Sequence, residues 1–278
     1  MKQPVSRHLL DIAIDRLADK YGDPIRIRRM MANTIICQML PEGVCVKGGS
    51  ALKFRFGDAA TRFTRDLDIA RSVDLAICVR EIDSALRKGW NGFTGVLVPG
   101  RKANPVDVPP QYVMEPFAAK LAYCHKPWLT VELEIGHNEI GDADTFDEGM
   151  PDQVRDIFAE LGLPTPRPVR LMSVSHQVAQ KLHALTAPGS KRAHDLLDLQ
   201  LIAANSQMDL PEILKVCRRL FSYRKMQTWP PTLESGTDWA ERYDAQKTGL
   251  PVLPSVDEAV AWANDLIQRI DDAEAALD

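Results

Sequence analysis

Residues 44–70, VCVKGGSALKFRFGDAATRFTRDLDIA, contain the pattern that decides the fold. The stretch opens with the apolar run Val44-Cys45-Val46, which predicts the start of a buried strand. The apolar-periodic segment that follows Ser50 predicts about two turns of helix. The stretch closes on Asp66-Leu67-Asp68-Ile69, where carboxylates alternate with apolar residues. This order predicts a strand, a short helix and a second strand that carries two aspartates.

The alternation places Asp66 and Asp68 side by side, because side chains on a strand switch faces with every residue. Leu67 and Ile69 then point into a core. Two neighbouring carboxylates repel each other unless something compensates their charge. Mg²⁺ usually takes one or two carboxylates together with substrate phosphates. The aspartate pair therefore predicts a site for Mg²⁺ or Mn²⁺.

The segment Gly48-Gly49-Ser50 has the features of a phosphate-binding turn. Glycines let the backbone come close to a ligand, and N–H groups at a helix start attract anions. We therefore predict Gly49 and Ser50 as nucleotide-binding residues. The alternative is a surface turn followed by an edge strand with solvated aspartates. The Gly-Gly-Ser segment favours nucleotide chemistry over this alternative.

These residues resemble those of a known group. Gly48-Gly49-Ser50 followed by Asp66-x-Asp68 is similar to the signature of the polymerase-beta-like nucleotidyltransferase superfamily. KGGSALKFRF and RFTRDLDIA resemble the AbiEii/AbiGii family, the toxin half of type IV toxin–antitoxin pairs, which includes the MenT toxins. The resemblance covers residues 44–201. It implies an α+β fold, with a mixed-sheet nucleotidyltransferase core and N-terminal helices, followed by a mainly helical C-terminal domain.

The composition excludes several classes of protein. The chain has 278 residues, of which 45% are hydrophobic, which suffices for one large domain or two modest ones. Its net charge of −4 argues against a generic nucleic-acid binder, so any RNA contact needs a local basic patch. Five scattered cysteines argue against a disulfide framework and a zinc site. The N-terminus has neither a signal peptide nor a transmembrane run, so we expect a cytoplasmic protein without membrane contact.

The hydrophobic periodicity changes along the chain. It predicts helices first, then a strand-rich core, and mainly helices after Pro151. We therefore predict a nucleotidyltransferase domain over residues 1–150 and a helical domain over 151–278. Residues 101–110 are rich in proline and lack helical periodicity, and the acidic, turn-rich residues 136–149 predict a loop. The predicted helices cover residues 9–17, 25–40, 75–86, 174–185, 195–204, 211–223 and 256–276; the further predicted strands cover 91–99, 117–124 and 129–135.

A third carboxylate is expected from residues 129–135, LTVELEI, in which Glu132 and Glu134 share one face of a strand. Two-metal transfer centres commonly add a carboxylate from a neighbouring strand. The family resemblance favours Glu134, just before Ile-Gly, and Glu132 is the alternative on the same face. An exposed sheet face that merely carries glutamates is the other interpretation.

The helical half contains two further motifs, QKLHAL with Lys181 and KRAHDLLDLQLI with Asp195 and Asp198. The two aspartates are three residues apart and share a helix face. From the residues alone, Lys181 is a surface lysine and the aspartates are capping residues. The motifs also resemble the lysine and aspartate motifs of AbiEii-like toxins. That resemblance implies that Lys181 holds the triphosphate, and that Asp195 or Asp198 orients Lys181 or helps to activate the acceptor.

The resemblance implies a metal-dependent nucleotidyltransferase in which Asp66, Asp68 and Glu134 ligate Mg²⁺ or Mn²⁺. Its substrate is a nucleoside triphosphate, and its acceptor is the 3′ end of tRNA. Such a toxin blocks translation and is neutralised by a cognate antitoxin; we expect it to be monomeric. Basic residues within 26–29, 101–102, 167–170, 191–192 and 218–225 favour an RNA acceptor over a cationic drug. The alternatives are a transferase that modifies a small molecule, such as an antibiotic hydroxyl, or a protein side chain, and a binding module with a degenerate site.

Overall fold

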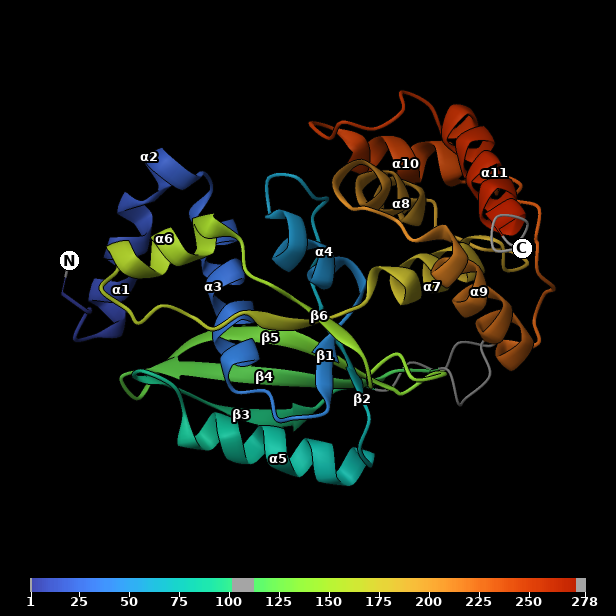
Figure 1. Cartoon of the computed structure of the whole chain (residues 1–278). Coiled ribbons are helices and arrows are strands. Elements are labelled where there is room, and N and C mark those ends of the chain that lie inside the picture. Colours follow the sequence, from blue (N-terminus) through green and yellow to red (C-terminus); the bar gives the residue numbers. More distant parts are fainter. Residues whose placement is uncertain (1, 102–112, 274–278) are drawn as a thin grey trace. The chain divides into compact units, whose positions relative to one another are not determined.

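The computed structural model describes residues 2–101 and 113–273, and it divides the chain into two compact units (Figure 1). The first unit comprises Met1–Gly57 and Thr64–Leu171. The second unit comprises Asp58–Phe63 and Met172–Asp278. The short segment Asp58–Phe63 therefore packs with the second unit, although the chain on both sides of it belongs to the first.

A seven-stranded sheet forms the centre of the first unit, in the order β3-β4-β5-β2-β1-β7-β6. The β2–β5 and β1–β7 pairs are parallel, whereas β1–β2, β3–β4 and β4–β5 are antiparallel. This mixed sheet confirms the predicted α+β class. Its strands are β1 (Val44–Val46), β2 (Leu67–Arg71), β3 (Phe93–Pro99), β4 (Glu115–Tyr123), β5 (Lys126–His137), β6 (Phe146–Gly149) and β7 (Val169–Met172).

Helices with local capping signals surround this sheet. Ser6 caps α1 (Arg7–Arg16) by accepting a hydrogen bond from the N–H of Leu9, as its position before the apolar period predicts. Asp23 caps α3 (Pro24–Gln38), and Asp74 caps α5 (Leu75–Lys88), which lies along β3 (Figure 1). The remaining helices of this unit are α2 (Ala18–Tyr21), α4 (Gly48–Phe56) and α6 (Asp152–Glu160).

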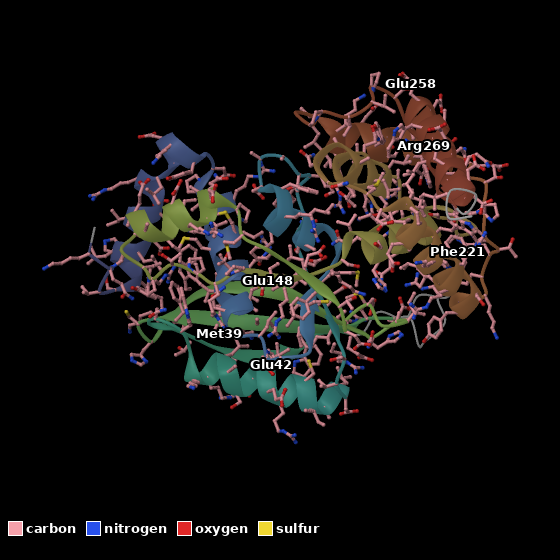
Figure 2. The ribbon with its side chains drawn as sticks, in the orientation of Figure 1. Met39, Glu42, Glu148, Phe221, Glu258 and Arg269 are labelled. Carbon is pink, nitrogen blue, oxygen red and sulfur yellow. The ribbon has the colours of Figure 1, made fainter. Side chains whose placement is uncertain are left out.

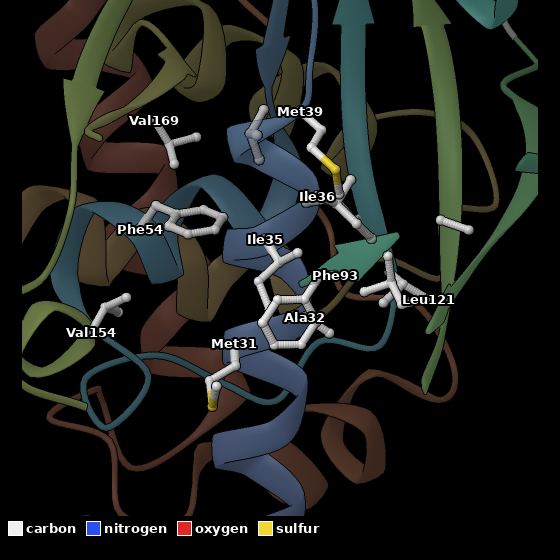
Figure 3. Close-up of a cluster of buried hydrophobic side chains, with 14 of the residues drawn as sticks. Met31, Ala32, Ile35, Ile36, Met39, Phe54, Phe93, Leu121, Val154 and Val169 are labelled. Carbon is white, nitrogen blue, oxygen red and sulfur yellow. The ribbon is translucent and has the colours of Figure 1, made fainter. Parts of the chain in front are cut away.

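The core of the first unit is built around α3. Figure 3 shows Ile35 and Ile36 of this helix among the buried side chains, together with Phe54 of α4 and Phe93 of β3. All four side chains are at most 4% exposed. Burying side chains of this size contributes about 1.5–3 kcal/mol each, so this cluster fixes the sheet and its helices together.

The second unit is mainly helical, in agreement with the prediction. Its helices are α7 (Val174–Leu185), α8 (His194–Asn205), α9 (Leu210–Arg224), α10 (Trp239–Lys247) and α11 (Val256–Asp272). Figure 2 shows the side chains of Glu258 and Arg269 on α11, both of which are exposed, and Phe221 on α9, which is buried. Among residues 2–101 and 113–273, no helix has the length and apolar character needed to cross a membrane.

The structure differs from the sequence-based expectations between residues 136 and 172. Part of the expected loop is strand, because β5 continues to His137 and β6 forms near its end. The structural division falls after Leu171, whereas the predicted boundary follows residue 150. Leu171 pairs with Val46 of β1, and α6 buries three apolar residues in the first core. Pro164, Pro166 and Pro168 therefore lie within the first unit. Residues 102–110 of the predicted proline-rich stretch and 274–276 of the last predicted helix lie outside the described residues.

Candidate active site

Two carboxylates lie next to each other on the central strands of the sheet. The parallel register of β2 and β5 pairs Asp68 with Glu134. The neighbours of both residues are buried on the opposite face, which leaves the two acids on the same open face. The buried neighbours are Leu67, Ile69, Leu133 and Ile135. The sequence-predicted carboxylates of the two strands are therefore brought together.

Asp66 and Glu132 extend this group by one step along the strands. The carboxyl group of Asp66 interacts with that of Glu132, and this interaction contributes to a raised pKa of Asp66. Burial raises the pKa of Asp66 to about 7, with further contributions from the bond to Glu132 and the negative charge of Asp68. Both glutamates that the sequence left as alternatives thus belong to the cluster. Glu132 is exposed, and Glu134 is half-buried.

The carboxylates follow the start of α4, which the Gly-Gly-Ser segment forms. Gly48 adopts φ +62°, and a Cβ atom at this residue would lie 2.3 Å from Oδ2 of Asp68. The N–H of Lys47 donates to the carbonyl oxygen of Asp68 at 2.8 Å. The hydroxyl of Ser50 donates to the carbonyl oxygen of Asp66 at 2.6 Å. These contacts bind the helix start to the aspartate strand.

The Ser50 hydroxyl therefore has a positioning role that the sequence did not suggest. Its only proton is engaged by the backbone of Asp66, and its side chain is fully buried. The backbone N–H groups at the first turn of α4 are the donors that a phosphate group needs, because the first four N–H groups of a helix lack helical partners. Nucleotide binding by Gly49 and Ser50 stays a prediction.

In the second unit, the structure brings Lys181, Asp195 and Asp198 together. Nζ of Lys181 donates to Oδ1 of Asp195 at 2.8 Å and to Oδ2 of Asp198 at 2.6 Å. All three residues are buried, so Lys181 is not the surface lysine that the residues alone predicted. Both aspartates hold the ammonium, and which of Asp195 and Asp198 acts in the reaction stays a prediction. An ammonium has three N–H donors, and the third is not used by these carboxylates.

Two arginines complete this cluster. Nε and Nη2 of Arg62 donate to Oδ1 and Oδ2 of Asp198, each at 2.9 Å. Nε of Arg192 donates to Oδ2 of Asp195 at 2.6 Å. Burial alone would raise the pKa of both aspartates. The positive charges of Arg192 and Lys181 outweigh burial at Asp195, and those of Lys181 and Arg62 do so at Asp198, so both pKa values lie below the usual range.

The environment of His194 is set by burial, and that of His183 by packing against an aromatic ring. Burial lowers the pKa of His194 to about 4, so its imidazole is neutral at physiological pH. His183 packs against the ring of Phe221, with ring centroids 4.9 Å apart, and its Nδ1 lies 3.3 Å from Arg224.

Sequence reasoning missed Arg62 and Gln177. Arg62 is 136 residues from Asp198, and no local pattern joins them. Gln177 lies one turn before Lys181 on α7 and is 2% exposed. Its amide nitrogen and oxygen are buried without a hydrogen-bond partner among the described residues. A buried amide next to a motif lysine is a signal that only the structure provides.

The carboxylate cluster fits a hard divalent cation. Among residues 2–101 and 113–273, no group of three or more His, Cys, Asp or Glu side chains is arranged to hold a metal ion by itself. Mg²⁺ needs no such site, because it takes one or two carboxylates and completes its shell with water and phosphate oxygens. Burial and the neighbouring carboxylates raise the pKa of Asp66, and a bound cation would offset the repulsion between these groups. Asp66, Asp68 and Glu134 offer only oxygen ligands, as such a cation requires.

A mixed sheet with paired carboxylates after a Gly-Gly-Ser helix start defines a nucleotidyltransferase-type protein. The model of the family described as "Nucleotidyl transferase AbiEii toxin, Type IV TA system" matches residues 29–265. The chain therefore belongs to the AbiEii family of nucleotidyltransferase toxins of type IV toxin–antitoxin systems. This membership confirms the resemblance that residues 44–70 carry.

Solved structures with similar folds include two bacterial proteins. JHP933 from Helicobacter pylori is 16% identical, with 89% of this chain and 93% of that chain covered at a TM-score of 0.45. MenT4, a nucleotidyltransferase toxin from Mycobacterium tuberculosis H37Rv, is 15% identical, with 98% and 99% covered at a TM-score of 0.48. A comparison with curated proteins gave no significant match.

The close approach of Gly48 to Asp68 gives a testable prediction. In Gly48→Ala, the new methyl group displaces the Asp68 carboxylate, and we expect Mn²⁺ affinity to fall by roughly tenfold or more, as for a misplaced ligand. Gly189→Ala is the matched control, because Gly189 also has positive φ (+67°) but nothing lies within 4 Å of its Cβ position. Mn²⁺ titration followed by electron paramagnetic resonance measures both. Equal affinities in the two variants would contradict the role of Gly48.

The buried Lys181 cluster predicts a large effect on stability. Lys181→Met leaves two buried carboxylates facing each other, and breaking such a pair costs about 3–5 kcal/mol. Adding Asp195→Asn removes the repulsion and should recover part of the loss. Lys191→Met, at an exposed lysine nearby in sequence, should change little. Urea unfolding measures all three; a Lys181→Met protein as stable as the wild type would rule out the buried ion pairs.

Proposed function

We propose that this protein transfers a nucleoside monophosphate from a nucleoside triphosphate to the 3′ end of tRNA, with Mg²⁺ or Mn²⁺ as cofactor. The proposal rests on one observation, the row of carboxylates on β2 and β5 against the Gly-Gly-Ser start of α4. Family membership supports nucleotidyl transfer as the reaction. The tRNA acceptor and the metal are our proposal.

Each candidate site residue of the first unit has a task in the proposed nucleotidyl transfer. Asp66 and Asp68 would hold the cation, and Glu134 beside Asp68 would ligate a second one. Metal ions at such a centre clamp the attacking and leaving oxygens of the displacement. The N–H groups at the start of α4 bind the β- and γ-phosphates.

The transfer is a single displacement at the α-phosphorus. The terminal hydroxyl of the acceptor forms the new P–O bond, and the bond to the β-phosphate breaks, so pyrophosphate leaves. Glu134 takes the proton of the attacking hydroxyl. Positioning and compensation of charge supply most of the rate enhancement, as in other phosphoryl transfers.

The second unit contributes positively charged side chains. We propose that Lys181 uses its third N–H to bind a phosphate oxygen, while Asp195 and Asp198 fix its orientation. On α9, Arg218 and Arg219 are exposed and suited to contact the RNA backbone. Modified tRNA no longer accepts an amino acid, which stops translation. We further propose a cytoplasmic monomer that a cognate antitoxin neutralises.

The variant Asp68→Asn tests the metal-dependent reaction. It keeps the shape of the side chain but removes a charged ligand, which costs several kcal/mol of transition-state stabilisation and at least about 100-fold in rate. Incorporation of label from each of the four α-labelled nucleoside triphosphates into tRNA measures the activity. Asp19→Asn, at an exposed position on α2, is the control. An Asp68→Asn protein that labels tRNA like the control would overturn the proposal.

RNA binding by α9 is tested separately. The double variant Arg218→Glu/Arg219→Glu should weaken tRNA binding and lower its salt dependence by roughly two counterions, since each lost phosphate contact lowers the slope by about one. Affinity for the nucleotide should stay unchanged. Arg87→Glu on α5 is the control, because Arg87 is exposed and pairs with an acid four residues earlier. If both variants bind tRNA equally well, the RNA surface lies elsewhere.

A further inference from the structure

The side chain of Lys47 lies on the carboxylate face of the sheet. A Cβ atom built on Gly136 would lie 2.8 Å from Nζ of Lys47 and 3.2 Å from its Cε. Gly136 pairs with Ala70 in the β2–β5 register, two residues beyond the pair Asp68 and Glu134. Because side chains two residues apart share a face, the ammonium continues the row of carboxylates by one step.

Among the described residues, no ion pair accounts for the position of this ammonium. Within residues 2–101 and 113–273, Lys47 makes no side-chain hydrogen bond and no ion pair, although it is half-buried. It is also the N-cap residue of α4, where the helix dipole is positive and a cation is unfavourable. A half-buried cation at the positive end of a helix is stabilised when an anion binds beside it.

We propose that Lys47 is a phosphate-binding residue for the triphosphate of the nucleotide, and that residue 136 is glycine to make room for its ammonium. The proposal rests on the proposed function and adds a ligand to it. Lys47 compensates the charge that develops on the leaving pyrophosphate and exchanges no proton. The triphosphate fits this place because Lys47 directly precedes the first N–H groups of α4, which lack helical partners as at any helix start.

The alternative role for Lys47 is to compensate the negative charge of the carboxylates. The two roles predict different changes in ligand affinity when Lys47 is removed. Removing a cation beside a metal site leaves Mn²⁺ binding unchanged or makes it tighter, because repulsion is lost. Removing a phosphate ligand weakens triphosphate binding. Measuring the affinity for each ligand alone therefore separates the roles, and neither measurement needs RNA or catalysis.

The experiment uses Lys47→Met, Gly136→Ala and the double variant in the full chain. Isothermal titration with inorganic tripolyphosphate, and Mn²⁺ titration without phosphate, give the two affinities. We expect Lys47→Met to bind tripolyphosphate roughly 10- to 100-fold more weakly, the effect of losing one charge-assisted hydrogen bond. Mn²⁺ should bind as well as in the wild type or better. Lys88→Met, at an exposed lysine of α5, should bind both ligands normally.

Gly136→Ala keeps the positive charge but moves it, since the new methyl group meets the flexible end of Lys47. It should weaken tripolyphosphate binding in the same direction, and the double variant should be no weaker than Lys47→Met. Unchanged tripolyphosphate affinity in Lys47→Met, additive effects in the double variant, or a wild type that binds no tripolyphosphate would overturn the proposal. A protein that shows these effects but labels no RNA would instead overturn the proposed function alone.

Discussion

The parallel pairing of β2 with β5 is the constraint on which the candidate site depends. Apolar residues on the core face fix the register, because a slip of one residue would bury the acids and expose Leu67 and Ile69. The same register sets Asp68 beside Glu134 on the other face. The same pairing that buries the apolar face therefore places several carboxylates side by side on the open face. The start of α4 is hydrogen-bonded to the backbone of both Asp66 and Asp68, and it places anion-binding N–H groups next to these carboxylates.

The pKa values of the aspartates shift in opposite directions in the two units. In the second unit, Lys181 and two arginines match the charges of Asp195 and Asp198, which keeps the pKa of each aspartate low. In the first unit, burial and the neighbouring carboxylates of Glu132 and Asp68 raise the pKa of Asp66. Strongly shifted pKa values of this kind cluster at functional sites. The first unit is therefore where we place the cation and the reaction.

Local patterns predicted the parts of the fold that depend on local sequence. The strand–helix–strand order of residues 44–70 and the shared face of Glu132 and Glu134 follow from periodicity alone. Periodicity does not predict contacts between residues that are far apart in the sequence. Examples are the ion pair of Arg62 with Asp198 and the position of the Lys47 ammonium next to Gly136. Pro164, Pro166 and Pro168 lie just before β7, which pairs with β1 in the sheet. Proline content describes the local backbone, whereas strand pairing depends on the partner.

The central claim is that the carboxylate row transfers a nucleoside monophosphate to RNA. The most direct test is mass spectrometry of purified tRNA after incubation with the wild-type protein, Mg²⁺ and the four nucleoside triphosphates together. We expect the 3′ end to gain the mass of one or more nucleoside monophosphates, with release of an equal amount of pyrophosphate. Unchanged tRNA, with the added mass on a protein or on a small hydroxylated compound instead, would contradict it.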